Sequence, residues 1–200
     1  MSVLENRTQI ISIPNLRDGD PEEIARMVSV HSPAIFRLAL KMLGNEQDAE
    51  DVLQETFFKA LRSLQTFEER SSLSTWLYRI TINESLMVLR KRKNNLVELD
   101  DPLEDNESVQ APVEIVDFCC LPERELADSE SKEFLNLAVS RLTPPLRAVF
   151  LLRDVEGQSV KETADTLRVS ESVVKTRLLR ARLKLREELS LYYKERMGKQ

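Results

Sequence analysis

The chain has 200 residues, of which 42% are hydrophobic, with a formal net charge of −5, two cysteines and four glycines. The hydrophobic share excludes wholesale disorder, and the length allows one domain or two small ones. Long segments of helical period with so little glycine predict an all-α protein. The cysteines, Cys119 and Cys120, are adjacent, which fits a reducing cytoplasm without a disulfide framework. No apolar run is long enough to cross a bilayer, so we expect no membrane insertion.

The first two helices are signalled by their caps and their spacing. At Asp20-Pro21-Glu22-Glu23 a capping side chain, a proline and acids favour a helix start, and we expect this helix to end near Leu43, before Gly44. A second helix is expected from near Gln47 to Leu64. Its apolar stripe comprises Ala49, Val52, Leu53, Phe57, Ala60, Leu61 and Leu64. Acids on its outer face surround a phenylalanine, which indicates either a protein-docking surface or a solvated acidic face.

The middle of the chain changes character twice. Residues 65–75 are rich in hydroxyls and predict a loop, after which Trp76 opens a third helix that becomes densely basic at residues 90–93. Such a run of cations either binds the phosphates of a nucleic acid backbone or stabilises the negative end of the helix dipole at a solvent-exposed C-terminus. Residues 94–130 are acidic, contain prolines and lack helical period until about Glu123, which predicts a mostly extended linker. Because cations and acids are segregated, the negative net charge does not exclude nucleic acid binding.

The second domain, expected from near Ser131, contains a candidate helix-turn-helix. Residues 159–162 fit the capping-box pattern, so we expect its first helix to run from Val160 to Leu167 and residues 168–170 to form the turn. The next helix has an apolar stripe of Val174, Leu178, Ala181, Leu185 and Leu189. Cations flank this stripe, and Thr176 and Leu179 point away from it, as expected of a helix that reads bases in the major groove.

Both halves resemble the extracytoplasmic-function (ECF) sigma factors of bacteria, in the family's order and spacing, over roughly residues 16–189. Residues 48–57 resemble the polymerase-docking helix, 71–80 the promoter-melting segment and 174–182 the recognition helix. The resemblance implies two small helical domains joined by an acidic linker, the second with a helix-turn-helix. The expected boundaries are 1–15 for a tail, 16–94 for sigma domain 2, 95–130 for the linker, 131–193 for sigma domain 4 and 194–200 for a second tail.

The resemblance also implies roles for individual residues. Those expected to dock on the polymerase β′ coiled coil are Asp48, Asp51, Gln54, Glu55 and Phe58. Those expected to hold the −10 element, including its flipped base, are Phe67, Arg70, Ser71, Ser72, Trp76, Arg79, Asn83, Arg90 and Arg92. For Trp76 the expected place is either under the loop or against the melted strand. Those expected to read or clamp the −35 element are Lys175, Thr176, Arg177, Leu179 and Arg180.

The expected partners are core RNA polymerase, through its β′ and β subunits, promoter DNA and an anti-sigma factor. We expect a cytoplasmic protein that is not an enzyme and that needs no cofactor or metal. The alternative is a helix-turn-helix repressor or activator that is not a polymerase subunit and whose N-terminal half dimerises or senses a ligand.

Four positions depart from the family pattern, and one of them is Met87, where an aspartate is frequent. Arg168 stands in the turn where the family usually has glycine or a small polar residue, and a left-handed backbone there would cost about 1 kcal/mol. Glu69 and Arg70 replace a commoner glycine-bearing loop, so the −10 preference is not inherited from the family. The single histidine, His31, is interpreted as a helix-surface residue.

Overall fold

The computed structural model describes residues 11–96 and 129–197, and within these ranges every regular element is helical. The first half contains α1 (Ile13–Arg17), α2 (Pro21–Leu43), α3 (Glu46–Ser63), the 3-10 turn η1 (Leu64–Thr66) and α4 (Leu73–Leu96). The second half contains α5 (Ser129–Arg141), α6 (Pro144–Phe150), the π-helical turn η3 (Leu151–Val155), α7 (Val160–Leu167) and α8 (Glu171–Met197). Most of the predicted linker, with both cysteines, lies outside the described residues.

The predicted bounds of α2 are confirmed, and its caps explain them. The Asp20 side chain accepts from the backbone N–H of Glu22, and Gly44 closes the C-terminus with φ 67°, a left-handed conformation that glycine adopts without strain. His31 is partly buried on this helix, and burial lowers its pKa.

The helices α2, α3 and α4 pack around a core that continues beneath the loop after η1. The apolar stripe predicted for the second helix is buried except for Leu53, which is partly buried, and Leu61, which lies at its angular edge and is 39% exposed. The third helix begins at Leu73 rather than Trp76, and η1 shortens the loop from residues 65–75 to 67–72. The Ser72 hydroxyl explains the earlier start, because it accepts a hydrogen bond from the backbone N–H of Thr75 at 3.1 Å.

The helix-turn-helix forms at α7 and α8. Ser159 and Glu162 make the predicted capping box, with the Ser159 side chain accepting from the Glu162 N–H and the Glu162 carboxylate accepting from the Ser159 N–H. Arg168 ends α7 in the left-handed conformation, with φ 55°. All members of the predicted apolar stripe of α8 are buried: Val174, Leu178, Ala181, Leu185 and Leu189.

Two predicted tails are wrong in part. Residues 13–15, assigned to an N-terminal tail, belong to α1, and Leu16 on this helix is only 2% exposed. At the other end α8 continues to Met197, beyond the predicted boundary at residue 193. A π-stack between Phe134 of α5 and Tyr192 of α8, with ring centroids 4.1 Å apart, holds the two helices together along this stretch.

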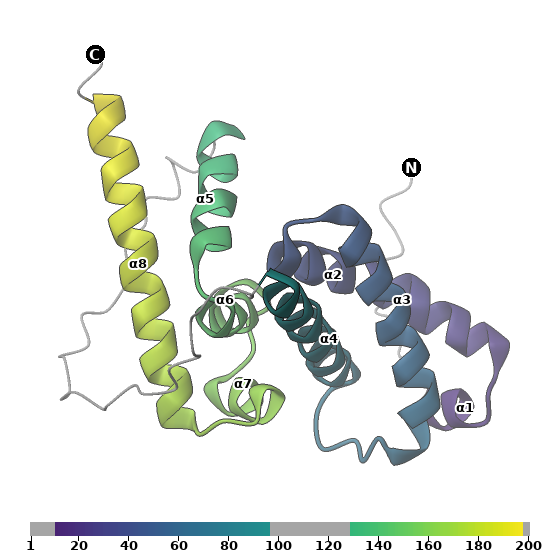
Figure 1. Ribbon diagram of the computed structural model, residues 1–200. Helices are drawn as coiled ribbons and strands as arrows, with labels where there is room; N and C mark the ends of the chain where they lie inside the picture. The colour runs from purple at the N-terminus through teal and green to yellow at the C-terminus, as the bar shows by residue number, and fades with distance from the viewer. Residues whose placement is uncertain (1–10, 97–128, 198–200) are drawn as a thin grey trace, which may run out of the picture.

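The two halves pack against each other, with α4 lying beside α6 and α7 (Figure 1). One hydrophobic cluster contains buried residues of both halves, such as Met42 and Leu151. The guanidinium of Arg147 on α6 is 8% exposed and donates to the Met42 carbonyl at 2.5 Å across the junction, and to the carbonyls of Ser140 and Leu142 in its own half. These three hydrogen bonds to carbonyls offset part of the cost of burying the charge, and burial lowers the pKa of Arg147.

Candidate functional site

The outer face of α3 exposes part of the set predicted to dock on a partner. Asp51, Gln54 and Phe58 are exposed, and Phe58 is 55% exposed with the guanidinium carbon of Arg62 at 5.3 Å from its ring centroid. Leu61, expected in the core, extends this face. The apolar part of the face is therefore larger than the sequence indicated, and a cation lies beside it.

The other two members of the set are already paired with cations of this chain. Asp48 forms an ion pair with Arg92 of α4, and Glu55 lies 3.3 Å from the ammonium of Lys59. Lys59 is also 2.7 Å from Glu84 of α4, and the hydrogen bond to Glu84 is the main cause that raises the pKa of Lys59. These contacts join α3 to α4 and leave the face less acidic than its sequence.

The loop of residues 67–72 rests on two buried aromatic side chains. Phe67 and Trp76 are 5% and 6% exposed, and their ring centroids are 4.8 Å apart. Both were assigned to the −10 element by the resemblance. The structure places them in the core, where they support the loop, and Trp76 occupies one of its two expected places, under the loop. Arg70 and Ser72 are exposed and Ser71 is partly buried.

Further along α4, the spacing of Arg79, Asn83 and Arg90 puts these residues on one side of the helix. Asn83 and Arg90 are exposed and Arg79 is partly buried. Arg92 lies on another side, where it pairs with Asp48 and donates to the Leu43 carbonyl at 3.2 Å. In this structure Arg92 thus closes the end of α2, and its contact with the −10 element stays a prediction.

The first turns of α8 present the residues predicted to read the −35 element. Lys175 and Thr176 are exposed, whereas Arg177, Leu179 and Arg180 are partly buried. Leu183, one turn beyond Leu179, is 48% exposed and was not included in the predicted set. Because the opposite side of the helix is a continuous buried stripe, these side chains are held on the outer surface.

An ion pair fixes the angle of α8 on the second half. The guanidinium of Arg182 donates to both carboxylate oxygens of Asp154 in η3, at 2.9 and 2.7 Å. This hydrogen bonding raises the pKa of Arg182, and the two-pronged geometry restricts rotation of the helix about its axis. The sequence pattern placed Arg182 only among the flanking cations.

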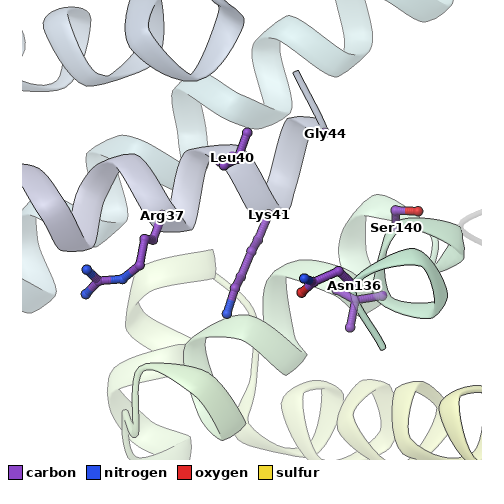
Figure 2. A pocket seen from close by; sticks show the side chains of 7 residues that line it. Arg37, Leu40, Lys41, Gly44, Asn136 and Ser140 are labelled. Atoms are coloured by element: carbon purple, nitrogen blue, oxygen red, sulfur yellow. The ribbon is translucent and has the colours of Figure 1, made fainter. Parts of the chain in front are cut away.

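A cleft of about 320 Å³ lies where the two halves meet, lined by side chains of α2 and α5 (Figure 2). Its cations are Arg37 and Lys41, and its apolar wall includes Leu40 and Val139. Sequence reasoning missed this cleft because it exists only when both halves are in place. No described helix is both long and apolar enough to cross a membrane.

Comparison with known proteins agrees with this geometry. The chain matches the family models Sigma-70 region 2 over residues 27–95 and Sigma-70, region 4 over residues 135–185. It is 31% identical over 177 residues to the ECF RNA polymerase sigma factor SigW of Bacillus subtilis, covering 88% of this chain and 94% of that protein. It is 35% identical over 169 residues to the ECF RNA polymerase sigma factor SigE of Mycolicibacterium smegmatis, covering 84% of this chain and 62% of that protein.

A solved structure has the same fold. The sigma factor RpoE in complex with the anti-sigma factor NepR from Bartonella quintana matches with a TM-score of 0.62 and 23% identity, over 84% of this chain and 98% of that chain. Both family models match in the order in which their regions occur along this chain, and the SigW match spans almost its whole length. The chain therefore belongs to the family of ECF RNA polymerase sigma factors.

Proposed function

We propose that this sigma factor binds core RNA polymerase and directs it to promoters that carry a −35 element read by α8 and a −10 element held by the loop of residues 67–72 and α4. The observation that carries the proposal is the division of α8 into a fully buried stripe and an outer surface of cations and Thr176. A helix with this division fits the major groove, where arginine and lysine pair with guanine and a methyl group contacts thymine.

For the −35 element, we assign base contacts to Lys175, Thr176, Leu179 and Arg180, and a phosphate contact to Arg177. The bidentate pair between Arg182 and Asp154 supports this assignment, because it fixes which side of α8 faces outward. Base contacts discriminate between sequences, whereas phosphate contacts supply affinity that falls with salt. The two classes therefore differ in how their loss changes promoter binding.

For the −10 element, we assign contact with the unstacked strand to Arg70, Ser71 and Ser72 in the loop and to Arg79, Asn83 and Arg90 on α4. Exposed hydroxyls and cations on one surface suit a single strand whose bases have left the stack. Phe67 and Trp76 support the loop from beneath. No catalytic side chain is needed, because the polymerase performs the chemistry.

For the polymerase, we assign the docking surface to the outer face of α3, with Asp51, Gln54 and Phe58 at its centre. The exposed carboxylate of Asp51 suits the basic coiled coil expected of the β′ subunit, and Phe58 supplies an apolar anchor. Asp48 and Glu55 join this surface only by exchanging their present partners, Arg92 and Lys59, for cations of the polymerase. A second contact, with the β subunit, remains part of the proposal.

Two further properties belong to the proposal. The protein acts in the cytoplasm, where the polymerase is, and an anti-sigma factor holds it inactive, as the solved RpoE structure contains a sigma factor in complex with one. We also propose domains of residues 16–94 and 131–193, and matches to the family models over residues 27–95 and 135–185 support this division.

The test is run-off transcription from a genomic fragment library with core polymerase, with and without the protein. New transcripts that share upstream elements would support the proposal and reveal both promoter motifs. Absence of any protein-dependent transcript, together with binding of a palindromic duplex by the protein alone, would instead support a repressor that is not a polymerase subunit.

A further inference from the structure

We propose that Arg17 is a positioning residue for −10 selection, through which the N-terminal helix α1 fixes the conformation of the loop of residues 67–72. The inference rests on the proposed role of that loop in holding the −10 element. The sequence pattern assigned no role to Arg17, and residues up to 15 were expected to form a tail.

The contacts of Arg17 surround the entrance of the loop. Its guanidinium donates to the Phe67 carbonyl at 2.5 Å and lies 3.1 Å from the Glu69 carboxylate. Its own backbone carbonyl accepts from the Gln65 side-chain amide at 2.8 Å. One residue of α1 thus binds three positions of a segment that lies about fifty residues further along the chain.

The loop needs such support because of its backbone. Glu69 has φ 57°, a left-handed conformation that glycine adopts readily but that is unfavourable for a residue with a side chain such as glutamate. The ion pair with Arg17 offsets part of this cost, because it holds the Glu69 side chain where the left-handed turn places it. The Phe67 ring, stacked on Trp76, and the Ser72 cap of α4 fix the two ends of the same segment.

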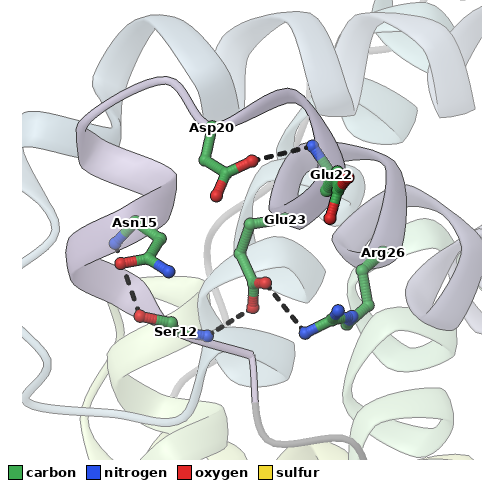
Figure 3. Close-up of polar contacts among 6 residues, drawn as sticks. All are labelled: Ser12, Asn15, Asp20, Glu22, Glu23 and Arg26. Atoms are coloured by element: carbon green, nitrogen blue, oxygen red, sulfur yellow. Dashed lines mark hydrogen bonds and ion pairs between the residues drawn. The ribbon is translucent and has the colours of Figure 1, made fainter.

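The helix that carries Arg17 is itself firmly attached (Figure 3). Glu23 of α2 accepts a hydrogen bond from the Ser12 backbone N–H at 2.6 Å and another from Arg26 at 2.9 Å. The Leu16 side chain is 2% exposed in the core beside Phe67 and Trp76. Helix α1 is therefore held in place, and the contacts of Arg17 hold the loop in a fixed position relative to it.

What this arrangement leaves accessible is the apex of the loop, where Arg70 and Ser72 are exposed. If the loop kept its sequence but lost the Arg17 contacts, these residues would sample several positions, and a pocket for one flipped base would become less selective. The predicted loss is in discrimination among −10 bases, with −35 discrimination and polymerase binding unchanged.

The experiment measures run-off transcription by holoenzyme on templates in which each −10 or −35 base pair of an active promoter is replaced in turn. The variants are Arg17→Ala, Arg17→Lys and Glu69→Gln, with Arg141→Ala as the matched control, because Arg141 forms an exposed ion pair with Glu188 in the other half. Thermal unfolding and core-polymerase binding are measured for each protein. Glu69→Gln keeps the bond to the Phe67 carbonyl, so it tests the inference even where Arg17→Ala folds poorly.

We expect Arg17→Ala to lower the transcription ratio between the best and the substituted −10 elements about fivefold, the size of one lost charge-assisted contact. Arg17→Lys and Glu69→Gln should lower it less, and the Arg17→Ala/Glu69→Gln double variant should fall short of the product of the single effects, since both remove the same contact. Arg141→Ala should match the wild type. Unchanged −10 ratios in the Arg17 and Glu69 variants, or an equal fall at −35 positions, would overturn the inference. A wild-type protein that shows no −10 preference would instead overturn the proposed role of the loop.

Discussion

Replacement of Arg168 by glycine is expected to stabilise the helix-turn-helix. Arg168 closes α7 with φ 55° and ψ 45°, and a left-handed backbone at an L residue costs about 1–2 kcal/mol relative to glycine. Its side chain is exposed, so no buried packing is lost on its removal. The backbone N–H groups of Arg168 and Val169 both donate to the Ala164 carbonyl and would remain in the glycine variant.

The net gain is smaller than the conformational cost that is removed. Glycine gives the unfolded chain more freedom, which opposes folding by about 0.5–1 kcal/mol relative to alanine. We therefore expect the free energy of unfolding to rise by about 0.5–1 kcal/mol, which corresponds to about 1–4 °C in melting temperature for a chain of this size.

The assay is thermal unfolding of the full chain, followed by circular dichroism. Arg168→Ala is the control, because alanine also removes the guanidinium but keeps the strained backbone. The glycine variant should melt above both the wild type and the alanine variant. A glycine variant that melts at or below the alanine variant would refute the strain argument.

Three further outcomes are expected. Asp51→Lys should abolish holoenzyme assembly without lowering the melting temperature, since Asp51 is exposed on the outer face of α3. The exposed acid Glu187 lies on α8, outside this face, so Glu187→Lys should still be retained by immobilised core polymerase, and equal retention of both variants would contradict the docking assignment. Arg180→Ala should lower the discrimination of the holoenzyme at one −35 base pair by about 1–3 kcal/mol of binding free energy, measured on duplexes in which each −35 base pair is substituted in turn. An equal loss of affinity for all duplexes would instead assign Arg180 to a phosphate contact. The hydrogen bonds with Ser159 hold the pKa of Glu162 below its ordinary value of 4.5, so the stability that its charge contributes is complete above that pH and is lost as the pH falls through the lowered pKa. The melting temperatures of wild type and Glu162→Gln should therefore converge in acid. A difference in melting temperature that persisted in acid would contradict a stabilising role for the Glu162 charge.

The helix-turn-helix could be predicted from the sequence because its signals are local. The capping box at Ser159 and Glu162 and the spacing of the α8 stripe each depend on residues within a few turns of one another. The same holds for α2, whose start at Asp20 and end at Gly44 are set by adjacent residues.

The surfaces of the first half could be predicted only in part, because they depend on residues from other helices. Helical spacing indicated which side of α3 faces outward, but the pairing of Asp48 with Arg92 requires α4 to return beside α3. The hydroxyl-rich composition of the loop indicated exposure, whereas Phe67 is buried by its stack on Trp76. Nothing near Arg17 in the sequence marks its partners, since they lie beyond two intervening helices.

The buried cation at the junction between the two halves does not by itself hold them together. Two of the three carbonyls bound by Arg147, those of Ser140 and Leu142, travel with it in the same half, and only the Met42 carbonyl belongs to the other. Separation would leave the cation still held on two sides, with water free to replace the third acceptor, so no unpaired charge is stranded. The closed arrangement therefore depends on the hydrophobic cluster shared by the two halves, whose exposure to water is the main cost of separating them.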